Sequence, residues 1–197
     1  MHDITIREET PADRAAIFEV NLRAFGQPGE ATLVDALRRD GDFIPELSLV
    51  AERDRTVLGH ILFPPVTLES KTGSVPALAL APMAVLPELQ RHGIGSLLVR
   101  EGLAACRRLG HRIVIIIGHP EYYQRFGFSP ARVRGIEAPF PVPDEAFMVL
   151  ALTEGSLEGV HGTVRYPPAF DASHGMIRSP IRIRSPVRED IRSPYRW

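Results

Sequence analysis

Two glycines and a glutamine stand between a strongly apolar run and a segment with helical periodicity. The stretch reads Gln90-Arg91-His92-Gly93-Ile94-Gly95-Ser96, in the pattern Gln-x-x-Gly-x-Gly. A strand that passes through such a turn into a helix leaves main-chain N–H groups unpaired at the positive end of the helix dipole. Glycines also let an anion approach the main chain closely. The pattern predicts a pyrophosphate-binding turn for a nucleotide-like cofactor, with a ligand-free helix start as the alternative.

Two common phosphate loops do not fit this turn. A P-loop needs a lysine directly after its last glycine, and the lysine of this chain, Lys71, lies well before the turn. A dinucleotide-binding fingerprint needs a third small residue after Gly93 and Gly95, where this chain has Leu98. The remaining pattern, Gln/Arg-x-x-Gly-x-Gly/Ala, resembles the acetyl-CoA pyrophosphate loop of the GNAT superfamily of N-acyltransferases.

A second segment carries the same resemblance. Residues 118–128 read Gly-His-Pro-Glu-Tyr-Tyr-Gln-Arg-Phe-Gly-Phe and follow another apolar run, 112–117. They resemble the Phe/Tyr-Tyr-x-x-x-Gly-Phe segment of GNAT proteins, and in their longer form the YhbS-like branch of these N-acetyltransferases. The opening residues 4–7 and the stretch 162–170 fit that branch too, so the resemblance covers roughly residues 3–170.

The resemblance implies a fold and a cofactor site. The fold is α/β, a mixed central sheet flanked by helices and splayed between the strands near 78–86 and 112–117. The splayed strands would hold the pantetheine arm of acetyl-CoA, and the glycine turn would hold its pyrophosphate. The implied cofactor-binding residues are Met83, Ala84, Val85, Gln90, Arg91, His92, Gly93, Ile94, Gly95 and Ser96.

The resemblance also points to Tyr123, which matches the second aromatic position of the motif. In the family, a tyrosine there faces the thioester sulfur. A phenol with a pKa of roughly 10 is protonated at neutral pH and can donate to the departing thiolate. Packing is the alternative for Tyr123, and it is the expected role of Tyr122.

The base that deprotonates the amine is less well defined. Many family members use a carboxylate on the strand before the turn, but residues 78–85 contain no ionisable side chain. His119 follows the neighbouring strand and titrates in a suitable range, although it could equally cap a turn. Glu30, at the start of a helix, could face the acceptor or simply be solvated, and a water chain would need neither. His60 is expected to be exposed to solvent.

Periodicity and turn residues predict the elements that position these groups. Thr10-Pro11 is a typical N-cap and first-turn pair. Helices are expected at about 10–25, 30–39, 96–109 and 121–126, and strands at 4–7, 47–52, 57–63, 78–86, 113–117, 147–152 and 162–166.

Composition is consistent with one globular domain. The chain has 197 residues, 44% of them hydrophobic, and a formal net charge of −1, which gives no sign of a nucleic-acid or membrane partner. Its one cysteine, Cys106, excludes an internal disulfide and a cysteine-based metal cluster, and is expected to be a small core residue. No metal is expected. The lack of an apolar signal or spanning segment predicts a cytoplasmic protein, monomeric or homodimeric.

The last part of the chain differs from the rest. Ile-Arg-Ser-Pro occurs at 177–180, 183–186 and 191–194. Residues 175–197 hold six arginines against two acids, a net charge of +4. We therefore expect an acyltransferase domain at 1–174 and a disordered basic tail at 175–197, with a partner-binding or phosphorylated arm as the alternative.

These observations predict an N-acetyltransferase that moves an acetyl group from acetyl-CoA to a primary amine of a small molecule or peptide. The sequence does not specify the acceptor. A catalytically inactive acyl-CoA sensor or partner subunit is the alternative, because the usual strand carboxylate is missing.

Overall fold

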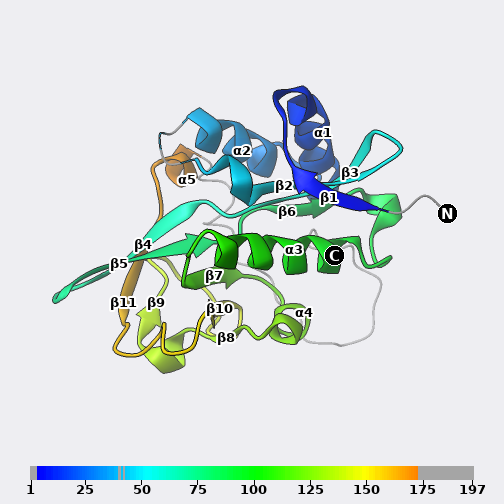
Figure 1. Cartoon of the computed structure of the whole chain (residues 1–197). Helices are drawn as coiled ribbons and strands as arrows, with labels where there is room; N and C mark the ends of the chain where they lie inside the picture. The colour runs from blue at the N-terminus through cyan, green and yellow to red at the C-terminus, as the bar shows by residue number, and fades with distance from the viewer. Residues whose placement is uncertain (1–3, 40, 42, 173–197) are drawn as a thin grey trace, which may run out of the picture.

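The strands of the protein form two sheets, flanked by helices (Figure 1). The computed structural model describes residues 4–39, 41 and 43–172. The predicted tail and its boundary at 174 lie outside the described residues. The four-stranded sheet has the order β1-β2-β3-β6, with β1 at Thr5–Glu8, β2 at Ser48–Arg53, β3 at Thr56–Leu62 and β6 at Met83–Val85.

The second sheet contains seven strands in the order β8-β10-β7-β5-β4-β11-β9. Their bounds are β4 Pro65–Ser70, β5 Gly73–Ala79, β7 Ile113–Ile117, β8 Ser129–Pro130, β9 Ile136–Glu137, β10 Phe147–Ala151 and β11 Gly162–Arg165. Neighbouring strands β5 and β7 run parallel, with Leu78 opposite Val114. The other long pairs are antiparallel, so the sheet is mixed.

The two sheets join at residues 80–82 and separate beyond them. The Leu80 N–H donates to the Ile115 C=O of β7 at 2.8 Å, whereas the Ala81 N–H donates to the Leu62 C=O of β3 at 3.0 Å. After this link, β6 pairs with β3 and not with β7, so a gap opens between β6 and β7. The expected splay is therefore confirmed, with the correction that the predicted strand 78–86 is two strands.

The sequence pattern also missed the hairpin formed by β4 and β5. Its register places Pro65 opposite Leu78 and Pro76 opposite Thr67. Prolines lack the N–H of a ladder bond and read as strand breaks. Here they lie within paired strands, and the hairpin extends the seven-stranded sheet away from the rest of the molecule (Figure 1).

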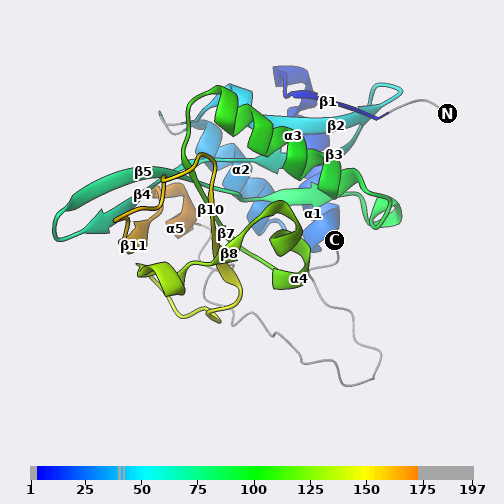
Figure 2. The same cartoon turned by 60° about the horizontal axis from the view of Figure 1, so that its bottom comes forward.

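Helices cover both faces of the four-stranded sheet. They are α1 at Arg14–Phe25, α2 at Gly29–Arg39, α3 at Ile94–Arg108, α4 at Pro120–Tyr123 and α5 at Ala169–Ala172, with 3₁₀ turns η1 to η5 at Pro11–Asp13, Pro45–Leu47, Pro87–Leu89, Gln124–Phe126 and Arg132–Arg134. Successive residues of a strand point to opposite faces. His60 contacts Asn21 of α1, and a Cβ on Gly59 would lie 3.0 Å from Leu98 of α3. The sheet thus lies between α1 and α3, and Figure 2 shows α3 lying across β2 and β3.

Because both faces of β3 are covered, His60 is buried, and the expectation of solvent exposure is wrong. Its Nε2 lies 2.9 Å from the Ser48 hydroxyl and its Nδ1 lies 3.3 Å from Asn21 Nδ2. The Ser48 hydroxyl donates to Glu9, which also accepts two hydrogen bonds from Arg38. These five side chains form a buried polar network that connects β2 and β3 with α1 and α2.

Candidate active site

The gap between β6 and β7 exposes main-chain groups of β6. In an antiparallel ladder, successive residues direct their N–H and C=O groups to opposite sides. The Pro82 C=O accepts from Leu62, and the Leu86 N–H donates to Leu58, so both face β3. Met83 and Val85 lie between these paired positions and therefore face the gap. The Val85 C=O accepts from Gln90 Nε2 at 3.1 Å, which leaves its N–H and both groups of Met83 facing the gap.

The turn after β6 directs further N–H groups toward the same region. Arg91 and Gly93 adopt left-handed backbone angles, with φ of 66° and 88°. The first intrahelical bond of α3 runs from the Leu97 N–H to the Gly93 C=O at 3.0 Å. The N–H groups of the first residues of α3, 94–96, consequently have no partner within the helix. Their position at the positive helix end makes this turn suitable for an anion.

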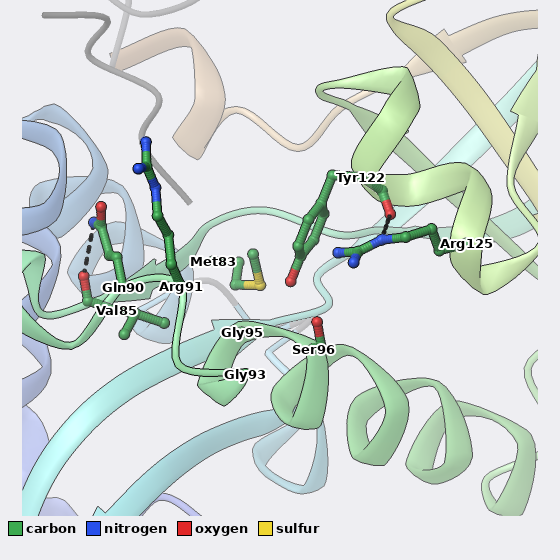
Figure 3. Close-up of a pocket in the computed structure, with 9 residues that line it drawn as sticks. All are labelled: Met83, Val85, Gln90, Arg91, Gly93, Gly95, Ser96, Tyr122 and Arg125. Carbon is green, nitrogen blue, oxygen red and sulfur yellow. Dashed lines mark hydrogen bonds between the residues drawn. The ribbon is translucent and has the colours of Figure 1, made fainter.

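A cavity of about 310 Å³ lies over this turn (Figure 3). Its walls include Met83 and Val85 of β6 and four further residues that the sequence predicted as cofactor-binding from the turn and α3: Gln90, Arg91, Gly93 and Gly95, together with Ser96. Three other residues predicted for the cofactor do not line it. Ala84 and Ile94 have buried side chains, and His92 is exposed, with its Nδ1 2.8 Å from the Gln90 C=O.

The opposite wall is formed by Tyr122 of α4 and Arg125 of η4. The Tyr122 hydroxyl points toward Gly95 and Ser96 (Figure 3), and a Cβ on Gly95 would lie only 2.9 Å from it. This hydroxyl is buried and has no hydrogen-bond partner in the described part of the chain. Burial raises the pKa of Tyr122, so the phenol remains a hydrogen-bond donor. The sequence prediction of a packing role for Tyr122 therefore missed a polar group in the cavity.

Tyr123 lies behind Tyr122 in the hydrophobic core. Its ring packs edge-on against Phe128, with centroids 5.9 Å apart, and it fills the space beside Gly118 at the end of β7. Only 1% of the residue is exposed, and it does not line the cavity. Burial raises the pKa of Tyr123 strongly, which keeps the phenol protonated. The structure thus places Tyr123 on the β7 side of the gap, in contact with the pocket wall rather than in it.

The two residues considered as bases lie outside the cavity wall. His119 is the N-cap of α4 and is half-buried. Glu30 lies in the first turn of α2 and is buried, and this burial raises the pKa of its carboxyl group. Its printed contacts are two long hydrogen bonds of 3.4 Å from Gln27 Nε2. Neither residue is brought next to Tyr123 by a printed contact.

Comparison with known proteins places this geometry in a family. A sequence model described as an acetyltransferase (GNAT) domain matches residues 5–131. The chain belongs to the GNAT acetyltransferase family. It is 40% identical to the uncharacterized N-acetyltransferase YjhQ of Escherichia coli (strain K12), over 78% of this chain and 87% of YjhQ. It is 35% identical to the uncharacterized N-acetyltransferase YhbS of the same organism, over 84% of this chain and 98% of YhbS.

Solved structures of GNAT proteins support the same assignment. YhbS from Escherichia coli in complex with CoA superimposes with a TM-score of 0.80 and 33% identity, covering 87% of this chain and 93% of YhbS. A GNAT acetyltransferase from Brucella melitensis in complex with acetyl-CoA gives a TM-score of 0.71 and 37% identity, covering 87% of this chain and all of that one. The predicted GNAT fold and its YhbS-like character are therefore confirmed, and the chain is a GNAT-type acyltransferase.

Other features of the described residues bear on the remaining expectations. Cys106 is buried in α3, and burial raises the pKa of its thiol to about 12, as suits a core residue. Within residues 4–39, 41 and 43–172, no three His, Cys, Asp or Glu side chains are grouped as metal ligands would be. No helix in these ranges has the length and apolar character needed to cross a membrane.

Proposed function

We propose that this protein transfers an acetyl group from acetyl-CoA to a primary amine. The observation that carries the proposal is the convergence of unpaired N–H groups from β6 and from the 90–96 turn on one cavity. The two relatives whose structures contain CoA and acetyl-CoA support it. In this arrangement the N–H groups of residues 94–96 hold the pyrophosphate, and the gap-facing groups of Met83 and Val85 pair with the pantetheine amides.

The carbonyl of Val85 refines this placement. Gln90 Nε2 already donates to it, so the glutamine of the motif fixes the turn against the end of β6. The N–H of Val85 and both main-chain groups of Met83 then serve the pantetheine. Ala84, His92 and Ile94 contribute through the main chain or not at all, because their side chains point elsewhere.

Tyr123 is the proposed proton donor to the CoA thiolate. Its strongly raised pKa makes it a donor and not a base at neutral pH. Its position against Gly118 supports a role on the β7 side of the gap, where the thioester would lie beyond the pyrophosphate turn. Replacement of Tyr123 by Phe is expected to lower kcat by about 10²-fold or more while acetyl-CoA binding is retained. A matched Tyr122→Phe variant should instead alter binding.

Glu30 is the proposed acceptor-side base. An amine with a pKa near 10 is almost entirely protonated at pH 7, so a carboxylate must take its proton. Burial raises the pKa of Glu30 and makes it a better base than an exposed glutamate. Glu30→Gln should reduce kcat/KM for the amine and leave acetyl-CoA affinity unchanged. Retained activity in this variant would return the role to His119 or to water.

The alternative is an acyl-CoA sensor without turnover. Residues 78–85 carry no ionisable side chain, and this absence of the usual base favours the sensor. The experiment is calorimetric titration with acetyl-CoA, followed by a screen of primary amines for CoA release. Saturable binding that Gly93→Glu and Gly95→Glu abolish, together with turnover that Tyr123→Phe removes, is expected. Binding without turnover by any amine would favour the sensor, and no binding by the folded protein would contradict both functions.

A further inference from the structure

Arg125 occupies an unusual position for an exposed cation. Its guanidinium carbon lies 4.6 Å from the centre of the Tyr122 ring, and its Nε donates to the Tyr122 C=O at 3.2 Å. It also lies 5.7 Å from the Phe126 ring. No carboxylate of the described residues forms an ion pair with Arg125. The side chain is thus held in place by ring and main-chain contacts, while its charge remains uncompensated.

The neighbouring Tyr122 hydroxyl is also without a partner. It is buried between Gly95 and the cavity, where a donor that makes no hydrogen bond costs free energy. Nothing on its own wall satisfies it. A ligand oxygen placed over the start of α3 would accept from it.

These two donors face the anion-binding turn from across the cavity. The turn supplies N–H groups and the helix dipole from below, and Arg91 and Arg125 flank it from opposite sides (Figure 3). A single carboxylate could use only part of this donor set. A phosphate group, with several strongly accepting oxygens and more than one negative charge, suits all of it.

We propose that Tyr122 and Arg125 form a phosphate clasp that closes over the CoA phosphates from the α4 side. The proposal rests on the proposed function, because it takes CoA as the ligand of the cavity. Tyr122 donates its hydroxyl to a phosphate oxygen, and Arg125, oriented by the Tyr122 ring and carbonyl, supplies the charge. The phosphate is either the pyrophosphate or the 3′-phosphate of CoA.

The test is calorimetry with two ligands, CoA and dephospho-CoA, which lacks the 3′-phosphate. The variants are Arg125→Ala, Arg125→Lys and Tyr122→Phe. The control is Arg134→Ala, which removes one exposed charge in η5, outside the cavity wall. Thermal unfolding of each variant verifies that it is folded.

We expect Arg125→Ala and Tyr122→Phe each to weaken CoA binding about tenfold, and Arg125→Lys to restore only part of the loss, since an ammonium lacks the planar fork. Equal losses with both ligands place the clasp at the pyrophosphate, and a loss with CoA alone places it at the 3′-phosphate. Either result supports the clasp.

Three results would overturn it. Unchanged affinities for both ligands in Arg125→Ala, or losses no larger than those of Arg134→Ala, would remove the clasp while leaving the CoA site intact. Failure of the wild-type protein to bind CoA would remove the proposed function and the clasp together.

Discussion

A side chain added at Gly93 would meet a different obstacle from one added at Gly95. At Gly93 the obstacle is the backbone, because φ is +88° and no atom lies within 4 Å of a Cβ. At Gly95 the obstacle is the Tyr122 hydroxyl. The first glycine therefore shapes the turn and leaves open space above it, and the second allows α4 to approach α3.

Gly93→Ala provides a test of that open space. Gly110 is a matched control, because it has φ of +81°, also lacks atoms within 4 Å of a Cβ, and lies at the far end of α3. Both substitutions should cost about 1 kcal/mol of unfolding free energy through backbone strain. Only Gly93→Ala should also weaken CoA binding, by about tenfold, because its methyl group enters the phosphate site. Similar CoA affinities in the two variants would contradict a phosphate at Gly93.

At the scale of elements, the buried network of Glu9, Ser48, His60, Asn21 and Arg38 holds two strands against two helices. Burial lowers the pKa of His60, although Glu9 opposes this shift. Burial would raise the pKa of Glu9, but hydrogen bonds from His60, Arg38 and Ser48 outweigh it and lower the pKa to about 2. The network is therefore built for a neutral imidazole and an ionised carboxylate.

Stability should fall as the pH drops below about 6.5, because the unfolded chain then binds a proton that the folded His60 does not. One such group changes the unfolding free energy by at most about 1.4 kcal/mol per pH unit. His60→Gln, which retains hydrogen-bonding capacity, should reduce this slope between pH 7 and 5. Denaturant unfolding at several pH values measures it. Glu9 has the same sign at lower pH, with stability lost from about 4.5 toward 2. Parallel profiles for wild type and variant would show that His60 is not the group.

The alternation along β6 gives a second element-scale prediction. Val85→Pro removes an N–H that faces the gap, whereas Ala84→Pro removes one that faces β3. We expect Val85→Pro to weaken acetyl-CoA binding about tenfold with a modest loss of stability. Ala84→Pro should destabilise the fold by about 3 kcal/mol. Chemical denaturation and calorimetry on both variants would distinguish them, and the reverse ranking of stabilities would contradict the assigned strand orientation.

At the scale of the whole molecule, acetyl-CoA would lie between the two sheets and contact both. A ligand at one hundred times its Kd adds about 2.7 kcal/mol to the unfolding free energy. For a chain of this size, that corresponds to a rise in Tm of about 5 to 10 °C. Thermal unfolding with and without acetyl-CoA measures it. Gly95→Glu is the control and should show no rise.

The order of most elements followed from the sequence, because helix caps, apolar periodicity and two motifs are local signals. Residues 78–86 show where local signals stop. Their apolar run indicates a strand, but the exchange of partners at 80–82 depends on β3 and β7, which are distant in sequence. The hairpin at 65–79 was missed for a related reason, since its prolines are tolerated only by the pairing around them.

The candidate site followed the same division. Main-chain positions of the turn were predictable, because glycine spacing determines them. The roles of Tyr122 and Tyr123 were not, because adjacent residues on a short helical turn differ in direction, and only tertiary packing decides which one enters the core. Arg125 lay within the recognised motif, yet its position over the Tyr122 ring has no signature in the sequence.

The interrupted strand has one more consequence, for amide hydrogen exchange. Along β6 the N–H of Ala84 is tied to β3, while those of its two neighbours face the gap. Deuterium uptake in the free protein should therefore alternate residue by residue, rapid at Met83, slow at Ala84 and rapid at Val85. When the cofactor supplies the missing acceptors, this alternation disappears, and three consecutive amides come to exchange as one continuous strand.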